Sequence, residues 1–165
     1  MKTVYIVRHA KSSWDSPQLE DYERPVIPKG FKRTERIIKF LQESGVKVDL
    51  LYASHAVRAA ETARMLGPAL GVEVDQIITE PEIYHGGTNA LSNLIYGLPN
   101  DVSSVMIVGH NPVVSDFANE YADQHIDWLP TSAVVALRFE TDAWEKIDQA
   151  KVETVFVVTP SMLKN

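Results

Sequence analysis

The chain has 165 residues, of which 45% are apolar, and its formal net charge at pH 7 is −6. This length and composition fit a single globular domain over residues 1–165, whereas the acidic balance argues against nucleic acid or an anionic membrane as a general partner, because either would require a sustained basic face. The chain has no cysteine, so disulfides, thiolate metal sites and cysteine nucleophiles are excluded.

The N-terminal segment holds the first predicted strand. Val4 to Val7 is a short apolar run rich in β-branched and aromatic side chains, which is typical of a strand buried on both faces of a parallel sheet. Arg8 and His9 follow at the end where open α/β sheets bind ligands, and two groups able to carry positive charge would attract an anion there. The alternative is a solvated Arg8 beside a hydrogen-bonded loop His9. The apolar run is too short for a signal peptide or a membrane span, which predicts a cytoplasmic protein.

A polar stretch over residues 12–28 predicts a long loop above this strand end, with a turn at Ser16-Pro17. We expect Trp14 and Tyr22 to anchor the loop to the body of the protein. From Gly30 to Gly45 the apolar residues repeat with helical spacing, which predicts an amphipathic helix. Its basic residues are most simply a solvent-facing side, and they include Lys32, Arg33, Arg36 and Lys39.

Asp49 to Ala53 predicts a second strand, and an alanine-rich helix begins after it near Ser54. Arg58 falls within about the first turn of that helix. A cation at the positive end of a helix is unfavourable unless an anion lies in front of both. Arg58 therefore indicates an anion site. Gly67-Pro68 is expected to end or kink the helix, and Leu70-Gly71 to close it.

A third strand is predicted at 76–79, before a loop that carries Glu82 and His85. Glu82 follows a strand end, as the two arginines do, whereas His85 is interpreted as an exposed loop residue. A helix with Leu91 and Leu94 on one side follows this loop.

The segment from Ser104 to Gly109 repeats the opening pattern of a buried strand. His110 then lies in the turn before a helix whose first position suits Pro112. The remaining chain predicts strands at 133–139 and 152–158, with a turn or short helix at 142–147.

Strands that alternate with helices predict an α/β fold with three layers, α/β/α, around a mostly parallel central sheet. Right-handed crossovers would bring successive strand ends to one edge, so that Arg8, His9, Arg58, Glu82 and His110 converge. Two guanidinium groups fit the oxygens of a phosphoryl group, and a helix N-terminus adds backbone donors. The expected ligand is a tetrahedral dianion.

Metal binding competes for the histidines, of which there are five. The sequence has no helical His-Glu-x-x-His motif and no Asp-x-Asp pair suited to Mg²⁺, and arginines beside the proposed ligands would repel a cation. We therefore expect no metal. A glycine-rich phosphate loop and a Gly-x-Ser-x-Gly elbow are also absent from the sequence.

Three motifs together resemble the histidine phosphatase superfamily, which contains cofactor-dependent phosphoglycerate mutase. They are Val7-Arg8-His9-Ala10, the segment from Ser54 to Thr62 around Arg58, and Val108-Gly109-His110-Asn111-Pro112. Further features resemble the small branch of phosphohistidine phosphatases of SixA type: the short chain, the segment from Arg8 to Trp14, Arg24-Pro25 before Gly30, Glu82-Ile83-Tyr84 and the closing Thr159-Pro160.

The resemblance implies a phosphoglycerate mutase-like fold and a phosphoenzyme route without a cofactor. His9 would be the nucleophile, and Arg8, Arg58, His110 and Ser54 would hold the phosphoryl group. Nearby arginines would favour the neutral form of His9, which the attack requires. Glu82 matches a glutamate of mutase-type members and would act as an acid or as an orienting group. Two residues depart from the commoner superfamily pattern, namely Ala10 and Asp15, and both fit the small branch.

The function expected from this resemblance is a metal-independent phosphatase that removes phosphate from phosphohistidine in a partner protein. Two alternatives stay open. One is a small-molecule phosphomonoesterase, similar to sugar phosphatases, which would use the same residues on a small phosphorylated substrate. The other is a non-catalytic regulator that binds phosphoryl groups through Arg8 and Arg58, and its binding would survive substitution of His9.

Overall fold

A computed structural model describes residues 1–15 and 17–163. The Ser16-Pro17 turn expected from the sequence therefore lies partly outside the described residues. The described chain forms one six-stranded sheet in the spatial order β3-β2-β4-β1-β5-β6. The strands are β1 (Lys2–Arg8), β2 (Leu50–Ala53), β3 (Ile78–Thr79), β4 (Ser104–Gly109), β5 (Val134–Phe139) and β6 (Val152–Val158).

Helices connect these strands. The α-helices are α1 (Pro28–Glu43), α2 (Val57–Leu70), α3 (Glu82–His85), α4 (Thr88–Tyr96) and α5 (Val113–Tyr121). Short 3-10 helices are η1 (Asp21–Glu23), η2 (Val74–Gln76), η3 (Trp144–Gln149) and η4 (Pro160–Leu163). The order of elements confirms the predicted alternation of strands and helices through β4.

The sheet is mixed. β1 and β2 both pair with β4 in parallel, and β3 adds to β2 in parallel. β5 pairs with β1 and β6 with β5 in the antiparallel sense. Because β1, β2 and β4 are parallel neighbours, their carboxyl ends meet at one edge of the sheet, where Arg8 lies opposite Gly109 and Ala53 opposite Val108.

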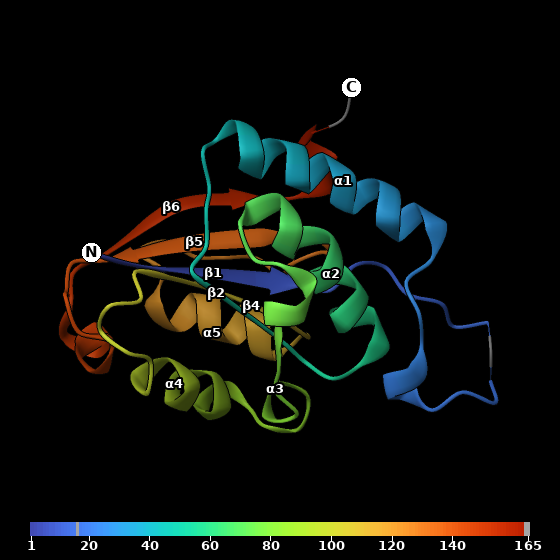
Figure 1. Cartoon of the computed structure of the whole chain (residues 1–165), viewed down its shortest axis with the longest axis horizontal. Helices are drawn as coiled ribbons and strands as arrows, with labels where there is room; N and C mark the ends of the chain where they lie inside the picture. Colours follow the sequence, from blue (N-terminus) through green and yellow to red (C-terminus); the bar gives the residue numbers. More distant parts are fainter. Residues whose placement is uncertain (16, 164–165) are drawn as a thin grey trace.

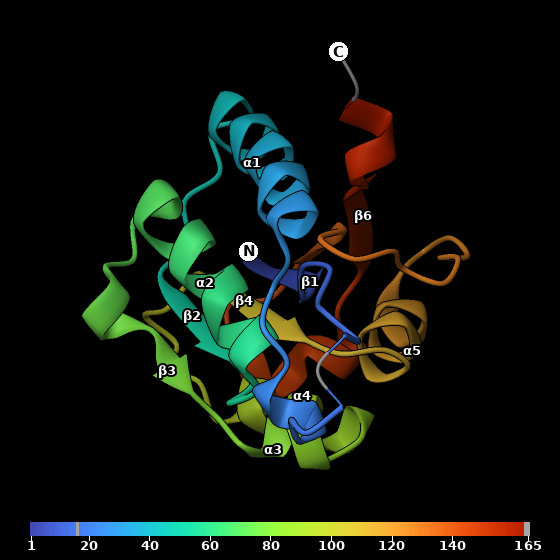
Figure 2. The same cartoon turned by 90° about the vertical axis from the view of Figure 1, so that its right-hand side faces the viewer.

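Helices cover both faces of the sheet, which confirms the three-layer α/β/α architecture (Figure 2). Side chains of α1 and α2, such as Ile37 and Leu66, pack with Val7 and Val108 on one face. Side chains of α4, α5 and η3 form the other core layer, including the fully buried Trp144. Burial on both sides accounts for the continuous apolar runs of the central strands.

The segment between β1 and α1 extends beyond the carboxyl end of the sheet and carries η1 (Figure 1). Its return is fixed close to β1, because the Ile27 amide donates to the Lys11 carbonyl at 3.0 Å. Gly30 permits this approach: a Cβ at that position would lie 2.5 Å from the Lys11 carbonyl oxygen. The start of α1 is thereby held against Lys11, two residues after His9.

Three local expectations need correction. The helix α2 does not end at Gly67-Pro68 but continues through Pro68 to Leu70. The closure expected at Leu70-Gly71 is confirmed, since the cap residue Gly71 has a φ of 101°, in the left-handed region. Glu82 and His85 are the two ends of the short helix α3 rather than loop residues.

The third correction concerns Trp14 and Tyr22, which lie in the segment between β1 and α1. Trp14 is 77% exposed and Tyr22 is 44% exposed, so neither side chain anchors the loop by burial. Trp14 instead lies against the guanidinium of Arg24, whose central carbon is 3.6 Å from the centre of an indole ring.

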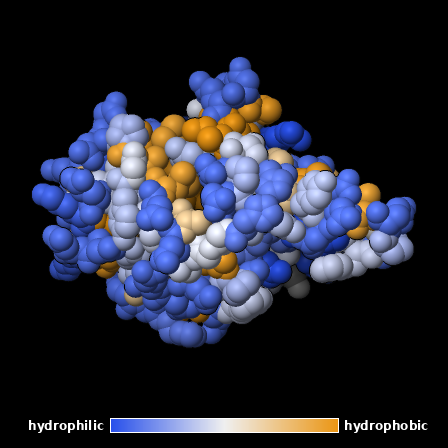
Figure 3. Space-filling model, turned by 90° about the horizontal axis from the view of Figure 1, so that it is seen from below, coloured by the Kyte–Doolittle hydropathy of each residue, from blue (hydrophilic) through white to orange (hydrophobic). Residues whose placement is uncertain are grey.

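Figure 3 shows the surface of the molecule from below the view of Figure 1. This surface is largely hydrophilic, with apolar patches between the hydrophilic residues. None of the helices in the described part of the chain combines the length and the apolar character needed to cross a lipid bilayer. The expected cytoplasmic location stays a prediction.

Candidate active site

The structure brings the predicted arginines and histidines together at the edge formed by β1, β2 and β4. Arg8 is the last residue of β1 and His9 follows it, while Arg58 is the second residue of α2. His110 comes directly after β4. The strand ends are joined by backbone bonds, since the His9 amide donates to the Gly109 carbonyl at 3.0 Å. Parallel pairing of distant segments therefore assembles the cluster.

His9 is 6% exposed, and its two ring nitrogens have distinct partners. Nδ1 lies 2.7 Å from the Ala10 carbonyl oxygen, which can only accept, so Nδ1 carries the proton. Nε2 is then unprotonated, and its lone pair accepts a hydrogen bond from Nε of Arg58 at 3.3 Å. Burial first, and then the charges of Arg58 and Arg8, lower the pKa of His9 to about 3 against the opposing effect of the Ala10 carbonyl.

His110 lies beside His9, with 5.1 Å between the ring centres. Its Nε2 is 2.8 Å from the hydroxyl oxygen of Ser54, which follows β2. Burial lowers the pKa of His110 to about 3, and His9 and Arg58 contribute in the same direction. Both rings are therefore neutral near neutral pH, and Ser54 joins the cluster as the sequence predicted.

Each of the three nitrogens of the Arg58 guanidinium donates a hydrogen bond. Nε donates to His9, Nη1 donates to the Asp21 carbonyl oxygen at 2.7 Å, and Nη2 donates to the Asp21 carboxylate at 3.0 Å. The start of α2 is also tied to the segment after His9, because the Thr62 hydroxyl accepts from the Ala10 amide at 2.9 Å and donates to the Arg58 carbonyl at 2.7 Å. Arg58 therefore has one defined orientation.

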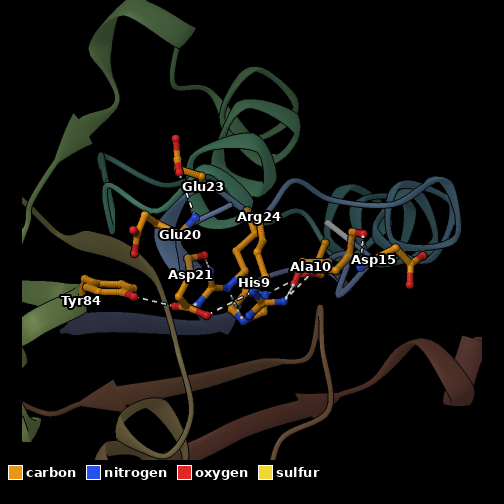
Figure 4. A network of polar contacts seen from close by, with 11 residues as sticks. His9, Ala10, Asp15, Glu20, Asp21, Glu23, Arg24 and Tyr84 are labelled. Atoms are coloured by element: carbon orange, nitrogen blue, oxygen red, sulfur yellow. Dashed lines mark hydrogen bonds and ion pairs between the residues drawn. The ribbon is translucent and has the colours of Figure 1, made fainter. Parts of the chain in front are cut away.

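Asp21 is the centre of a polar network that the sequence did not predict (Figure 4). Besides Arg58, its carboxylate accepts from Nε of Arg24 at 3.1 Å and from the Tyr84 hydroxyl at 2.5 Å. Burial raises the pKa of Asp21, but the hydrogen bonds from Tyr84 and Arg58 outweigh it and lower the pKa to about 2. The ring of Tyr84 in turn meets His110 edge-on, with centres 5.2 Å apart.

Arg8 faces a pocket beside His9. Its Nη1 donates to the Leu129 carbonyl oxygen at 2.9 Å, while its buried Nε has no hydrogen-bond partner among the described residues. Burial and the charge of Arg58 lower the pKa of Arg8. The pocket has a volume of about 240 Å³ and is lined by Arg8, His9, Lys11, Ser12, Trp14, Arg24 and Thr131. Three of these side chains are cations, which suits an anionic group.

Glu82 stands apart from the other predicted residues. It is exposed, and among the described residues its carboxylate makes no hydrogen bond or ion pair with His9, His110 or either arginine. Tyr84, two positions later on α3, reaches the network through Asp21 instead. The resemblance included Tyr84 in a motif but gave it no role.

The described residues contain no group of three or more histidine, aspartate or glutamate side chains placed to hold a metal ion. The donor groups around His9 are instead guanidinium, imidazole and hydroxyl groups from Arg8, Arg58, His110 and Ser54. Such groups are suited to phosphoryl oxygens.

Comparisons with known proteins show the family and the fold of the chain. The profile of the Histidine phosphatase superfamily (branch 1) matches residues 4–94. An uncharacterized chloroplastic protein of Arabidopsis thaliana is 28% identical over 88% of this chain and 70% of its own. The phosphohistidine phosphatase SixA of Escherichia coli is 22% identical over 81% of this chain and 82% of its own.

Among solved structures, the protein histidine phosphatase SixA complexed with tungstate superposes with a TM-score of 0.83 at 22% identity. The match covers 98% of this chain and 99% of the other, so the whole fold is shared. The profile match spans more than half of the chain and includes both arginines and His9. The chain therefore belongs to the histidine phosphatase superfamily, branch 1, and is a hydrolase of the phosphatase class.

Proposed function

We propose that this protein removes phosphate from phosphohistidine in a partner protein, through a phosphoenzyme intermediate on His9 and without a metal ion. The observation that carries the proposal is the state of His9: Nδ1 is protonated against the Ala10 carbonyl, and the lone pair of Nε2 is directed toward Arg58. A neutral imidazole nitrogen beside two guanidinium groups is suited to attack a phosphorus atom whose oxygens those groups bind.

In the first step, Nε2 of His9 attacks phosphorus, and the bond from phosphorus to the substrate nitrogen breaks. The substrate imidazole leaves with the electron pair of that bond, and it leaves neutral if its other nitrogen is already protonated. Phospho-His9 then carries a positively charged ring whose Nδ1–H donates to the Ala10 carbonyl. Arg8 and Arg58 offset the negative charge on the phosphoryl oxygens, and the neutral His110 donates a hydrogen bond to one of them from its protonated ring nitrogen.

In the second step, water attacks phosphorus, the Nε2–P bond breaks, and its electron pair returns to Nε2. The water proton leaves to solvent, inorganic phosphate is released, and His9 regains its neutral form. A neutral imidazole is a good leaving group in both steps, so strong acid assistance is less necessary than for an alkoxide. This agrees with the exposed position of Glu82 and the lack of contact between its carboxylate and His9 in the described structure.

The test is turnover and trapping in the presence of a chelator. A histidine-phosphorylated protein and a small aryl phosphate ester are offered in parallel, and phospho-His9 is sought after rapid quenching. His9→Asn should lower turnover at least ~10³-fold and abolish labelling. In the assay with the aryl phosphate ester, His125→Asn is the matched control, because the side chain of His125 is 79% exposed and does not line the His9 pocket. The phosphoenzyme route is wrong if wild type hydrolyses phosphohistidine without labelling at His9.

The same panel decides between substrate classes. A higher kcat/KM for the phosphohistidine protein supports the proposal, and a higher kcat/KM for small esters supports the phosphomonoesterase alternative. The open pocket beside His9, with Trp14 exposed on its lining, favours a protein side chain as the group that enters it.

A further inference from the structure

A large groove runs along α1 next to the His9 pocket. Its volume is about 910 Å³, and its walls are the outer side of α1, the segment 130–131 and the start of η4. Thr131 lines both the groove and the His9 pocket, so the two lie next to each other at this residue. We call this feature the α1 groove.

The α1 groove concentrates positive charge in an acidic protein. Four cations line it, Lys29, Lys32, Arg33 and Arg36, and Glu35 is the one carboxylate among its lining residues. The groove thus has a net charge of +3 in a chain whose formal charge is −6. Within the described part of the chain, none of the four cations forms an ion pair.

The fold does not account for these cations. Lys29 lies in the first turn of α1, where the helix dipole disfavours positive charge, and this turn contains no acidic residue. The helix already has Pro28 at its first position and a buried apolar side that packs on α2. A bound anion would offset the unfavourable placement of the cations.

Exposed apolar side chains flank the α1 groove. Pro130 lines the groove and also a smaller pocket of about 230 Å³ that includes Trp128 and Met162. Trp128 is 62% exposed and Met162 is 64% exposed. Large aromatic and methionine side chains are enriched at protein interfaces, and neither Trp128 nor Met162 lines the His9 pocket that a small phosphate ester would enter.

We propose that the α1 groove binds an acidic segment of the partner protein and thereby presents its phosphohistidine to His9. This inference rests on the proposed function, since it names the surface that selects the substrate protein. The cations attract the acidic segment, and Trp128 and Met162 contact apolar residues beside it. Because the groove and the His9 pocket share Thr131, a segment bound in the groove lies next to His9.

The experiment uses short synthetic peptides with one central histidine, flanked on one side by glutamates or by glutamines. Their unphosphorylated forms, labelled with a fluorophore, measure binding by anisotropy, and their phosphohistidine forms measure kcat/KM. Wild type should bind the acidic peptide more tightly and hydrolyse its phosphorylated form with a higher kcat/KM. High salt should remove both preferences, because the cations are exposed or only partly buried.

Matched variants locate the effect. Lys29→Gln with Lys32→Gln should weaken binding of the acidic peptide about three- to tenfold, as the loss of two exposed ion pairs would. Lys39→Gln with Lys47→Gln removes the same charge from exposed positions that do not line the α1 groove, and it should leave binding unchanged. Turnover of a small aryl phosphate ester should be equal in all three proteins.

Each outcome decides one claim. Equal binding of acidic and neutral peptides, or equal losses in the two double variants, overturns the α1 groove as the docking surface while leaving the phosphatase proposal intact. Selective binding of the acidic peptide without hydrolysis of any phosphohistidine peptide overturns the proposed substrate and supports the groove. A single-stranded oligonucleotide of equal charge is also tested as a competitor of the labelled acidic peptide. If it competes as strongly as the unlabelled acidic peptide does, the proposal that the α1 groove binds a protein segment is wrong.

Discussion

At the scale of single residues, the surroundings of His9 and His110 keep both imidazoles uncharged. Burial is the main cause in each case, and Arg58 adds a repulsive charge to both. The pKa of each ring falls to about 3, far below the ordinary value of 6.5. The proposed nucleophile therefore keeps its lone pair over the whole physiological range of pH.

This neutrality can be observed directly. We predict that the ring C–H signals of His9 and His110 in NMR spectra keep the chemical shifts of neutral imidazole between about pH 8 and pH 5. The variants His9→Asn and His110→Asn assign the two signals. A titration midpoint near pH 6.5 for either ring would show that the arginines and burial do not keep that ring uncharged.

The Asp21 carboxylate places a negative charge next to Arg58, which we propose to bind phosphate. Its carboxylate is 3.0 Å from Nη2 of Arg58, so an incoming dianion meets both an occupied guanidinium and a repulsive charge. We predict that Asp21→Asn lowers the inhibition constant of inorganic phosphate by roughly tenfold, or about 1.4 kcal/mol. Inhibition is measured competitively against an aryl phosphate ester.

The control for Asp21→Asn is Asp142→Asn, which removes the same charge from a fully exposed side chain. A higher inhibition constant in Asp21→Asn would contradict the prediction and would indicate that Asp21 serves chiefly to position Arg58. Loss of the repulsive charge lowers the inhibition constant, whereas loss of the positioning of Arg58 raises it. One measurement therefore separates the two roles of Asp21.

The sequence predicted some residues of the site and not others, for a physical reason. Arg8, His9 and His110 stand at strand ends, and Arg58 lies in the first turn of the helix that follows β2. Parallel pairing brings these strand ends together. Asp21 lies in a connecting segment, 37 residues from Arg58, and no periodicity governs where such a segment folds back. The hydrogen bond between Tyr84 and Asp21 joins residues that are 63 positions apart in the sequence, and no local sequence pattern predicts it.

At the scale of elements, the junction of α1 with β1 depends on close backbone contact at Gly30. A Cβ there would lie 2.5 Å from the Lys11 carbonyl oxygen and 2.9 Å from a methyl group of Val26. We predict that Gly30→Ala lowers the free energy of unfolding by about 1–3 kcal/mol, because the helix must move away from the strand end. Urea denaturation measures the change.

Gly97→Ala is the matched control for Gly30→Ala. The nearest atom to a Cβ at Gly97 would be 3.7 Å away, which is ordinary van der Waals contact. Its backbone φ of −86° also suits alanine. Equal losses of stability in the two variants would show that close packing at Gly30 does not hold the start of α1.

The elements themselves were predictable where hydrophobic pattern decides them. Continuous apolar runs identified β1 and β4, and helical spacing identified α1, because both patterns follow from burial. The antiparallel direction of β5 was not predictable, since a strand buried on both faces has the same pattern in either direction. The partly exposed edge strand β6 pairs with β5 in the antiparallel sense. The continuation of α2 through Pro68 reflects a proline near the helix end, where the αL cap at Gly71 closes the last turn.

At the scale of the whole molecule, the two neutral histidines link stability to pH. Each has a folded pKa of about 3, whereas the unfolded chain binds a proton at each with the ordinary pKa of 6.5. Between these values the unfolded state binds more protons than the folded state, so lowering the pH favours unfolding. The contribution to stability is fully present above pH 6.5 and is lost progressively below it.

We therefore predict that the free energy of unfolding falls as the pH decreases below about 6.5, by up to about 1.4 kcal/mol per pH unit for each of the two histidines. Asp21, whose pKa is lowered to about 2 from 3.8, adds a further loss only below about pH 4. Urea denaturation at several pH values between these limits isolates the histidine contribution. The double variant with His9→Asn and His110→Asn cannot take up these protons, so its pH dependence should be flatter over the same interval. Equal slopes for wild type and the double variant would mean that the stability of the folded chain does not depend on keeping these two rings neutral.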